Sequence, residues 1–257
     1  MTATISTGTT APLDVTAIPV LAHAEAMGLA ADEFTRMVEL LRTLRTDEWS
    51  MDTVCSLWTV QQMVAHVVGM AEAQASFRQF AHDFSVARKR SGGAMIDALN
   101  ASQVRDRADL TPEELVNRLA AIAPKAVRSR RRTPAVMRKV VRFKQDPPFG
   151  TERWRYGFLV DTIFTRDTWM HRLDISRATG RDMATSQQHD GRIVAGTVAE
   201  WAHRHAEPFT LRLNGTAGGT WRAGDGGELI ELDALEFCWI VSGRAPGQGL
   251  LATPVPF

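Results

Sequence analysis

Apolar side chains recur at helical spacing through most of the chain up to Gly180. The pattern predicts four long helices, over about residues 20–45, 59–80, 111–128 and 156–179. Thr59 and Thr111 stand where N-terminal caps are expected, and Gly180 stands where the last helix should stop. Four long helices joined by connections of different length indicate a helical bundle.

The pattern changes after Gly180. A helix is expected from about 187 to 205, and period-two alternation with Gly-rich turns predicts short strands at 209–213, 220–222 and 229–232. Asp233, with Glu236 three residues further on, resembles a capping box at the start of another short helix. This part of the chain is expected to form a small α+β domain.

These patterns predict a mainly α protein with two folded parts. Residues 1–18, rich in Thr and Ala, are expected to be a flexible tail. A four-helix bundle is expected over 19–183, followed by the small α+β domain over 184–257. The chain is long enough, and with 44% hydrophobic residues apolar enough, to bury its own core.

Charge and cysteine content narrow the class of protein. Thirty basic and 29 acidic residues nearly cancel, which gives no reason to expect nucleic acid as a partner. No apolar run is long enough to span a membrane, and no secretory signal is recognisable. Only Cys55 and Cys238 occur, far apart, so a cytoplasmic protein without a disulfide scaffold is expected.

A dense basic run occupies residues 125–144 and is followed by a Pro- and Gly-containing break at 146–150. Basic runs without interleaved aromatic residues are usually solvated, so a helix end and a loop are expected here. Nucleic-acid binding is the alternative.

The helix predicted over 156–179 carries candidate metal ligands. Asp167 and His171 are four residues apart, so their side chains lie on one face and could bind one metal ion. His66 lies among apolar residues of the second helix, where a buried imidazole needs a partner. A metal shared with Asp167 and His171 would supply that partner. The alternative is an intrahelical Asp–His pair and a core histidine bonded to a carbonyl group.

Two segments carry a family resemblance. Residues 58–66, WTVQQMVAH, and residues 167–174, DTWMHRLD, resemble the signature stretches of the DinB-like, mycothiol-dependent maleylpyruvate isomerase family. The resemblance implies a DinB-like four-helix bundle that holds a zinc-type ion through His66, Asp167 and His171. It also implies a sterol-carrier-like C-terminal domain, on the segments 219–221, 233–235 and 242–244.

One ligand position departs from the family pattern, because the family's isomerase commonly has Glu where this chain has Asp167. Asp174, one turn beyond His171, is expected to lie outside the ligand set and to pair with an arginine such as Arg172 or Arg177.

The resemblance implies a metal-dependent enzyme, with Zn²⁺ as the expected ion and mycothiol as thiol cosubstrate. Three protein ligands leave coordination positions open, and a metal-bound thiol favours its thiolate form. Isomerisation of a small electrophilic substrate, or S-transfer to it, is therefore expected. Arg244 is the candidate catalytic cation for a substrate carboxylate; the alternative is an ordinary surface arginine.

Two other functions are compatible with the sequence. The same three ligands with a metal-bound water would make a hydrolase. A non-catalytic protein could instead bind a small molecule in its C-terminal domain. A strict requirement for mycothiol would argue against the hydrolase. A stoichiometric content of divalent metal would argue against the non-catalytic binding protein. The chain is expected to be a monomer or a homodimer without membrane or nucleic-acid partners.

Overall fold

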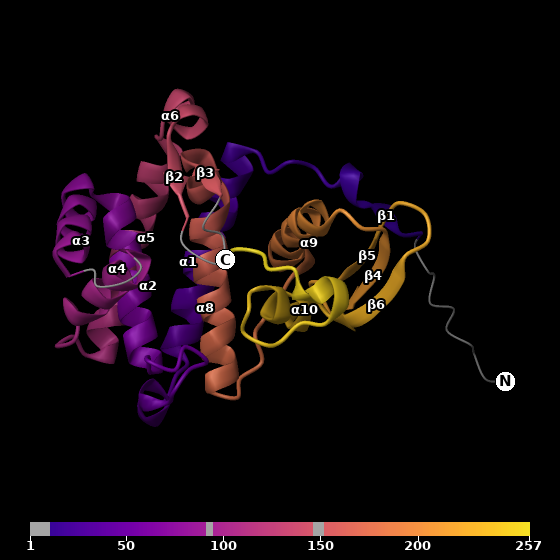
Figure 1. The fold of residues 1–257 in the computed structure, drawn as a ribbon. Helices are drawn as coiled ribbons and strands as arrows, with labels where there is room; N and C mark the ends of the chain where they lie inside the picture. The colour runs from indigo at the N-terminus through magenta and orange to yellow at the C-terminus, as the bar shows by residue number, and fades with distance from the viewer. Residues whose placement is uncertain (1–10, 91–94, 146–151) are drawn as a thin grey trace. The chain divides into compact units, whose positions relative to one another are not determined.

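The computed structural model describes residues 11–90, 95–145 and 152–257 (Figure 1). Within this range the chain divides into two units, which are described in turn. The larger unit comprises 21–184 together with Phe257, and the smaller one comprises 11–20 together with 185–256. Among the described residues, no helix combines the length and apolar character needed to cross a bilayer.

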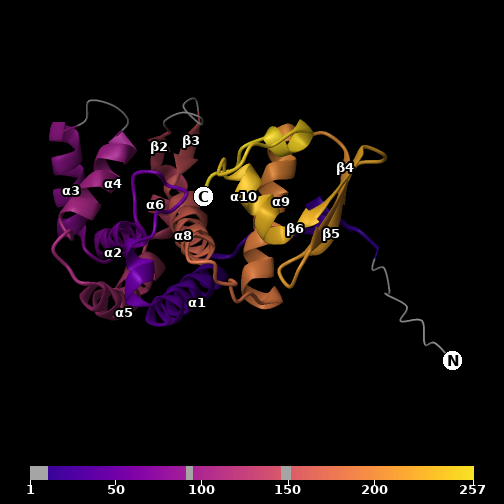
Figure 2. The ribbon, with the colours of Figure 1, turned by 90° about the horizontal axis from the view of Figure 1, so that it is seen from below.

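The larger unit is built around a four-helix bundle. Its helices are α1 (His23–Arg42), α2 (Val60–Ala75), α5 (Pro112–Arg131) and α8 (Phe164–Ala178). Helices α1 and α2 each pack against both α5 and α8 (Figures 1 and 2). Their apolar stripes meet in a common core that includes Phe34, Met37, Met63 and Leu119. The predicted caps are confirmed, because Thr59 and Thr111 both form capping boxes.

The second predicted helix was drawn too long. Helix α2 ends at Ala75, Ser76 is extended, and α3 (Phe77–Arg90) and α4 (Met95–Arg105) follow. The Ser76 hydroxyl accepts a hydrogen bond from the backbone N–H of Gln79, which starts a new helix. The helices α3 and α4 pack on each other and on α2. Neither was predicted as a helix of its own.

The basic segment is more structured than a solvated helix end and loop. After α5 come α6 (Ala135–Val140), β2 (Arg142–Lys144) and β3 (Arg153–Arg155), and the two strands pair antiparallel. One basic residue, Arg130, is buried. The predicted break at 146–150 lies outside the described residues.

The fourth predicted helix is not regular. It begins with α7 (Tyr156–Phe158) and a π-helical turn (Leu159–Ile163) before α8. Arg130 donates hydrogen bonds to the carbonyl oxygen of Val160 in this turn and to the Thr165 hydroxyl. The buried guanidinium thus satisfies a backbone acceptor that the π turn displaces from the regular helical ladder.

The smaller unit packs helices on one face of a four-stranded sheet (Figures 1 and 2). Its elements are β1 (Leu13–Asp14), α9 (Arg192–His205), β4 (Phe209–Asn214), β5 (Gly219–Ala223), β6 (Glu228–Asp233) and α10 (Ala234–Val241). The strand order is β1-β5-β4-β6, with β4 antiparallel to β5 and parallel to β6. Trp201, Phe209 and Phe237 meet edge to face in the core.

The expected tail of residues 1–18 needs correction. Leu13 and Asp14 pair in parallel with Trp221 and Arg222 of β5, and Val15–Ala17 form a short 3-10 helix. A two-residue edge strand is too short to show a period in the sequence, which is why it was missed. Residues 1–10 lie outside the described part.

A buried ion pair joins α1 to α8. Glu33 and Arg172 are both almost fully buried, and the guanidinium donates to both carboxylate oxygens, at 2.7 and 3.0 Å. A bidentate pair of this kind fixes the distance and rotation of the two helices. One of these helices carries Asp167 and His171, so the pair also positions the candidate site.

Replacing Glu33 by alanine should lower the free energy of unfolding by about 3–5 kcal/mol, because a buried guanidinium loses its carboxylate. Urea denaturation measures this change. The adjacent Asp32 is exposed, and Asp32→Ala should alter stability by no more than about 0.5 kcal/mol. Equal effects of the two substitutions would contradict the structural role of the Glu33–Arg172 pair.

Candidate metal centre

The three predicted ligands come together inside the bundle. Helix α2 contributes His66, and α8 contributes Asp167 and His171 one turn apart. One ligand atom of each lies within 4.8 Å of the others. Asp167 Oδ2 is 3.9 Å from His66 Nε2, and Oδ1 is 3.5 Å from His171 Nε2. Both imidazoles are buried, while the Asp167 side chain keeps one-fifth of its surface exposed.

Each imidazole is oriented by an oxygen acceptor behind it. His66 Nδ1 lies 2.8 Å from Gln103 Oε1, and His171 Nδ1 lies 2.9 Å from Asp174 Oδ2. When Nδ1 carries the proton and donates it to these oxygens, Nε2 presents its lone pair toward Asp167. An outer oxygen on the second ring nitrogen is the usual partner of a metal-ligating histidine. Asp174 thus holds His171, a partner that the sequence did not suggest, and its place outside the ligand set stays a prediction.

Gln103 was not predicted as part of the site, because α4 itself was not predicted. It is buried, and its approach to His66 depends on Gly69 of α2. A Cβ atom at Gly69 would lie 2.7 Å from Gln103 Cβ and 2.9 Å from an Arg107 nitrogen. The missing side chain thus lets α4 come close enough to reach His66. A glycine within a helical pattern was the sequence signal for such an approach.

Trp58 covers the two histidines from one side. Its ring centroid lies 5.0 Å from that of His66 and 6.4 Å from that of His171. Trp58 is half-buried and packs against the apolar core of the bundle. In the structure it forms an apolar wall that keeps water from the imidazoles and strengthens electrostatic interactions there.

The two histidines differ in charge. Burial lowers the pKa of His66 to about 4, although the Asp167 carboxylate partly opposes this shift. Burial also acts to lower the pKa of His171, but the carboxylates of Asp167 and Asp174 outweigh it and raise the pKa to about 9. At neutral pH the metal-free site therefore contains a neutral His66 and a protonated His171 between two carboxylates.

The donor set fits a divalent ion of the zinc type. Two imidazole nitrogens and one carboxylate oxygen are ligands that Zn²⁺ commonly uses, and three protein ligands leave at least one coordination position open. The hydrogen bonds on both Nδ1 atoms aim the remaining nitrogens at a common point. The side chains at this site thus supply both the ligand atoms that a divalent ion needs and the hydrogen bonds that orient them.

The fourth candidate, Arg244, belongs to the smaller unit. It follows α10, its backbone N–H donates to the carbonyl oxygen of Trp239, and its guanidinium lies 6.0 Å from the centre of the Trp239 ring. Its role toward a substrate carboxylate stays a prediction.

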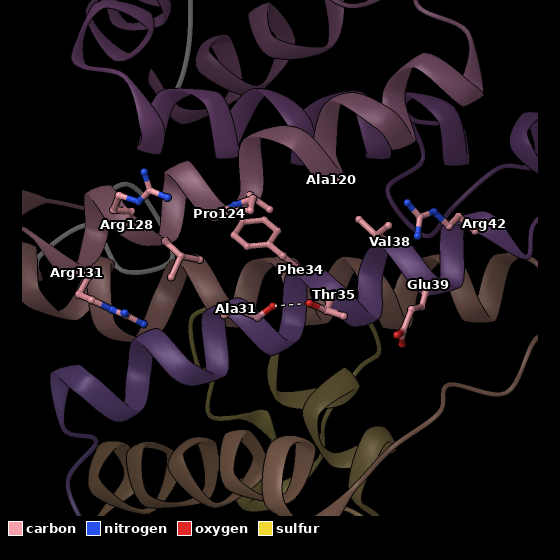
Figure 3. Close-up of a pocket in the computed structure, with 12 residues that line it drawn as sticks. Ala31, Phe34, Thr35, Val38, Glu39, Arg42, Ala120, Pro124, Arg128 and Arg131 are labelled. Atoms are coloured by element: carbon pink, nitrogen blue, oxygen red, sulfur yellow. Dashed lines mark hydrogen bonds between the residues drawn. The ribbon is translucent and has the colours of Figure 1, made fainter.

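A groove of about 490 Å³ lies elsewhere on the bundle, between α1 and α5 (Figure 3). Phe34 and Pro124 lie in its middle, Arg128 and Arg131 at one end and Arg42 at the other. None of the three predicted metal ligands lines it. The groove is therefore distinct from the candidate metal centre.

Replacing Gly69 by alanine should destabilise the bundle by about 1–3 kcal/mol, because the new methyl group overlaps Gln103. Gly28 in α1 is the matched control, since a Cβ atom there would meet nothing within 4 Å. Gly28→Ala should stabilise the protein by about 0.5–1 kcal/mol. Thermal unfolding of both variants measures the difference. A stabilising Gly69→Ala would contradict the close approach of α4.

Asp174→Asn should weaken Zn²⁺ binding by about 10–100-fold, because the amide replaces the carboxylate that holds His171. Gln103→Leu should have an effect in the same range through His66. Isothermal titration with Zn²⁺ measures both, with Asp32→Asn on the exposed face of α1 as control. Unchanged affinity in both variants would show that the two hydrogen bonds do not support metal ligands.

Known proteins resemble this chain in sequence and in fold. The family model described as mycothiol maleylpyruvate isomerase N-terminal domain matches residues 30–176, more than half of the chain. A crystal structure of the mycothiol-dependent maleylpyruvate isomerase is similar at a TM-score of 0.56 and 16% identity, covering 90% of this chain and 92% of that chain. A histidine-to-alanine mutant of that enzyme matches at 0.55 and 14%, with the same coverage.

Among curated proteins, the search gave no match. The structural likeness confirms the predicted mainly α fold, and the family match confirms the resemblance on which residues 58–66 and 167–174 were interpreted. The chain belongs to the mycothiol maleylpyruvate isomerase N-terminal domain family.

Proposed function

We propose that this protein is a mycothiol-dependent isomerase or S-transferase whose divalent metal, Zn²⁺, is held by His66, Asp167 and His171. The observation that carries the proposal is the convergence of these three side chains from two helices, with an oxygen acceptor behind each imidazole. Family membership supports mycothiol as the cosubstrate and a small electrophile as the substrate.

The chain's own residues prepare this site in three ways. Gln103 and Asp174 hold the two imidazoles so that Nε2 faces inward. Asp167 supplies negative charge between them, which offsets the charge of an incoming cation. Trp58 excludes water from one side of the histidines. The partly exposed Asp167 side chain leaves the site open toward solvent, where substrates can enter.

A divalent ion bound to these residues would favour the thiolate of a coordinating thiol at neutral pH, which makes that thiol a nucleophile. The candidate ligand set contains no cysteine, so the thiol belongs to the cosubstrate. Addition of the thiolate to an electrophilic double bond leaves a carbanion; rotation about the new single bond and expulsion of the thiolate then isomerise the substrate. Protonation of that carbanion, with the new C–S bond retained, gives S-transfer.

Arg244 would bind a substrate carboxylate through its guanidinium. Asp167 is one methylene shorter than the Glu that is common in the family's isomerase. Its carboxylate would therefore reach less far from α8 toward the metal. A cytoplasmic location, where low-molecular-weight thiols are kept reduced, suits the proposed chemistry.

Replacing His171 by alanine should weaken Zn²⁺ binding by more than about 100-fold, beyond what loss of an outer partner causes. It should also abolish conversion of electrophiles that depends on mycothiol. Elemental analysis after dialysis against Zn²⁺, and a screen of electrophilic carboxylic acids with and without mycothiol, measure the two effects. His203→Ala, at an exposed histidine of α9, is the control and should retain both.

The outcomes separate the proposed function from its alternatives. Far-UV circular dichroism checks that His171→Ala keeps its helices. Metal-dependent turnover without any thiol would instead indicate a hydrolase. In that enzyme the same three residues would hold a metal that activates water. Wild-type protein that takes up no stoichiometric divalent metal would favour a non-catalytic binding protein.

A further inference from the structure

A second cluster of metal-binding side chains lies on the α3–α4 hairpin. His82 and Asp83 are neighbours on α3, and Asp106 lies in the turn directly after α4. One ligand atom of each residue lies within 4.8 Å of the others. His82 Nε2 and Asp106 Oδ2 are 3.4 Å apart. The cluster shares no residue with the bundle site.

Asp83 shows that this cluster differs from an ordinary surface ion pair. Its side chain is completely buried, although it carries a carboxylate. Oδ1 accepts a hydrogen bond from Gln79 Nε2 at 2.7 Å. Oδ2 is buried and has no hydrogen-bond partner within the described part of the chain. A buried carboxylate oxygen that lacks a partner is unfavourable unless a cation or a proton compensates its charge.

The neighbouring arginine does not supply that cation directly. Arg107 is buried, and its Nε donates to the Glu72 carboxylate at 3.1 Å while Nη1 donates to the carbonyl oxygen of Gln103. Its second terminal nitrogen also contacts Glu72. These bonds direct the guanidinium toward α2. Asp83 Oδ2 therefore accepts no hydrogen bond from this guanidinium, and its candidate cation partners lie on the side of His82 and Asp106.

We propose that His82, Asp83 and Asp106 form a second divalent-cation site, separate from the bundle site. One imidazole nitrogen and two carboxylate oxygens form a donor set that suits Zn²⁺ or Mn²⁺. Two carboxylates also match the charge of a divalent ion. His82 and Asp106 are partly exposed, so an ion can enter from solvent and can retain water ligands.

A cation bound at this site would also affect the bundle site, because it would fix the position of α4. A cation here joins α3 to the end of α4. Arg107 follows Asp106 directly and donates to the carbonyl oxygen of Gln103, whose side chain holds His66. Binding at the hairpin would therefore fix the helix that orients one ligand of the bundle site. The bundle site does not need the second ion for its own ligand set.

The test uses the full-length protein and Zn²⁺ as probe. After dialysis against Zn²⁺, wild type should hold about two ions per chain, and Asp106→Asn and His171→Ala about one each. The double variant Asp106→Asn/His171→Ala should hold none. Asp97→Asn, which removes another exposed carboxylate of α4, should keep the wild-type content. Zn²⁺ should raise the melting temperature of His171→Ala but not that of the double variant.

The second site would be overturned by His171→Ala that binds no Zn²⁺, or by Asp106→Asn with the same Zn²⁺ content as wild type. A loss of Zn²⁺ from Asp97→Asn equal to that from Asp106→Asn would show non-specific binding to surface carboxylates and would also contradict the proposal. Circular dichroism verifies that each variant is folded. Because Asp106→Asn leaves all three bundle ligands in place, failure of the second site does not affect the proposed function, and the reverse also holds.

Discussion

The candidate site depends on the orientation of two buried imidazoles. Each histidine has one nitrogen bound to a side-chain oxygen, so the other nitrogen must face the space beside Asp167. A buried imidazole without such a partner could rotate or exchange its proton, and the site would lose its geometry. The ion pair between Glu33 and Arg172 and the capping boxes of α2 and α5 hold the helices in register. The packing of the bundle thereby keeps the hydrogen bonds of the two Nδ1 atoms in place.

The two imidazoles are held by residues of different helices, one by a residue of α8 and the other by a residue of α4. Asp174 lies one turn beyond His171 on α8, so that half is built within a single helix. The half around His66 requires α4, and α4 requires the small residue at position 69. Arg107 then fastens α4 to Glu72 on α2. Residues of a single helix position the candidate ligand His171, whereas the packing of α4 on α2 positions the candidate ligand His66.

The sequence allowed the helices to be predicted where apolar spacing was regular and a cap was present, as for Thr59 and Thr111. The convergence of His66 with Asp167 and His171 followed from their faces and from the family resemblance. Gln103 was not predicted, because no helix had been assigned to residues 95–105 and its contact with His66 joins residues 37 positions apart. The two-residue strand at Leu13 has too few positions for a pattern, and its pairing with Trp221 is a long-range contact.

The central claim is that one divalent ion is bound by two imidazoles and one carboxylate within the bundle. X-ray absorption spectroscopy of Asp106→Asn protein, loaded with less than one equivalent of Zn²⁺, tests it most directly. We expect nitrogen and oxygen ligands at about 2.0–2.1 Å, with the multiple scattering of two imidazoles. A spectrum with a single imidazole, with none, or with sulfur from a protein cysteine would contradict it.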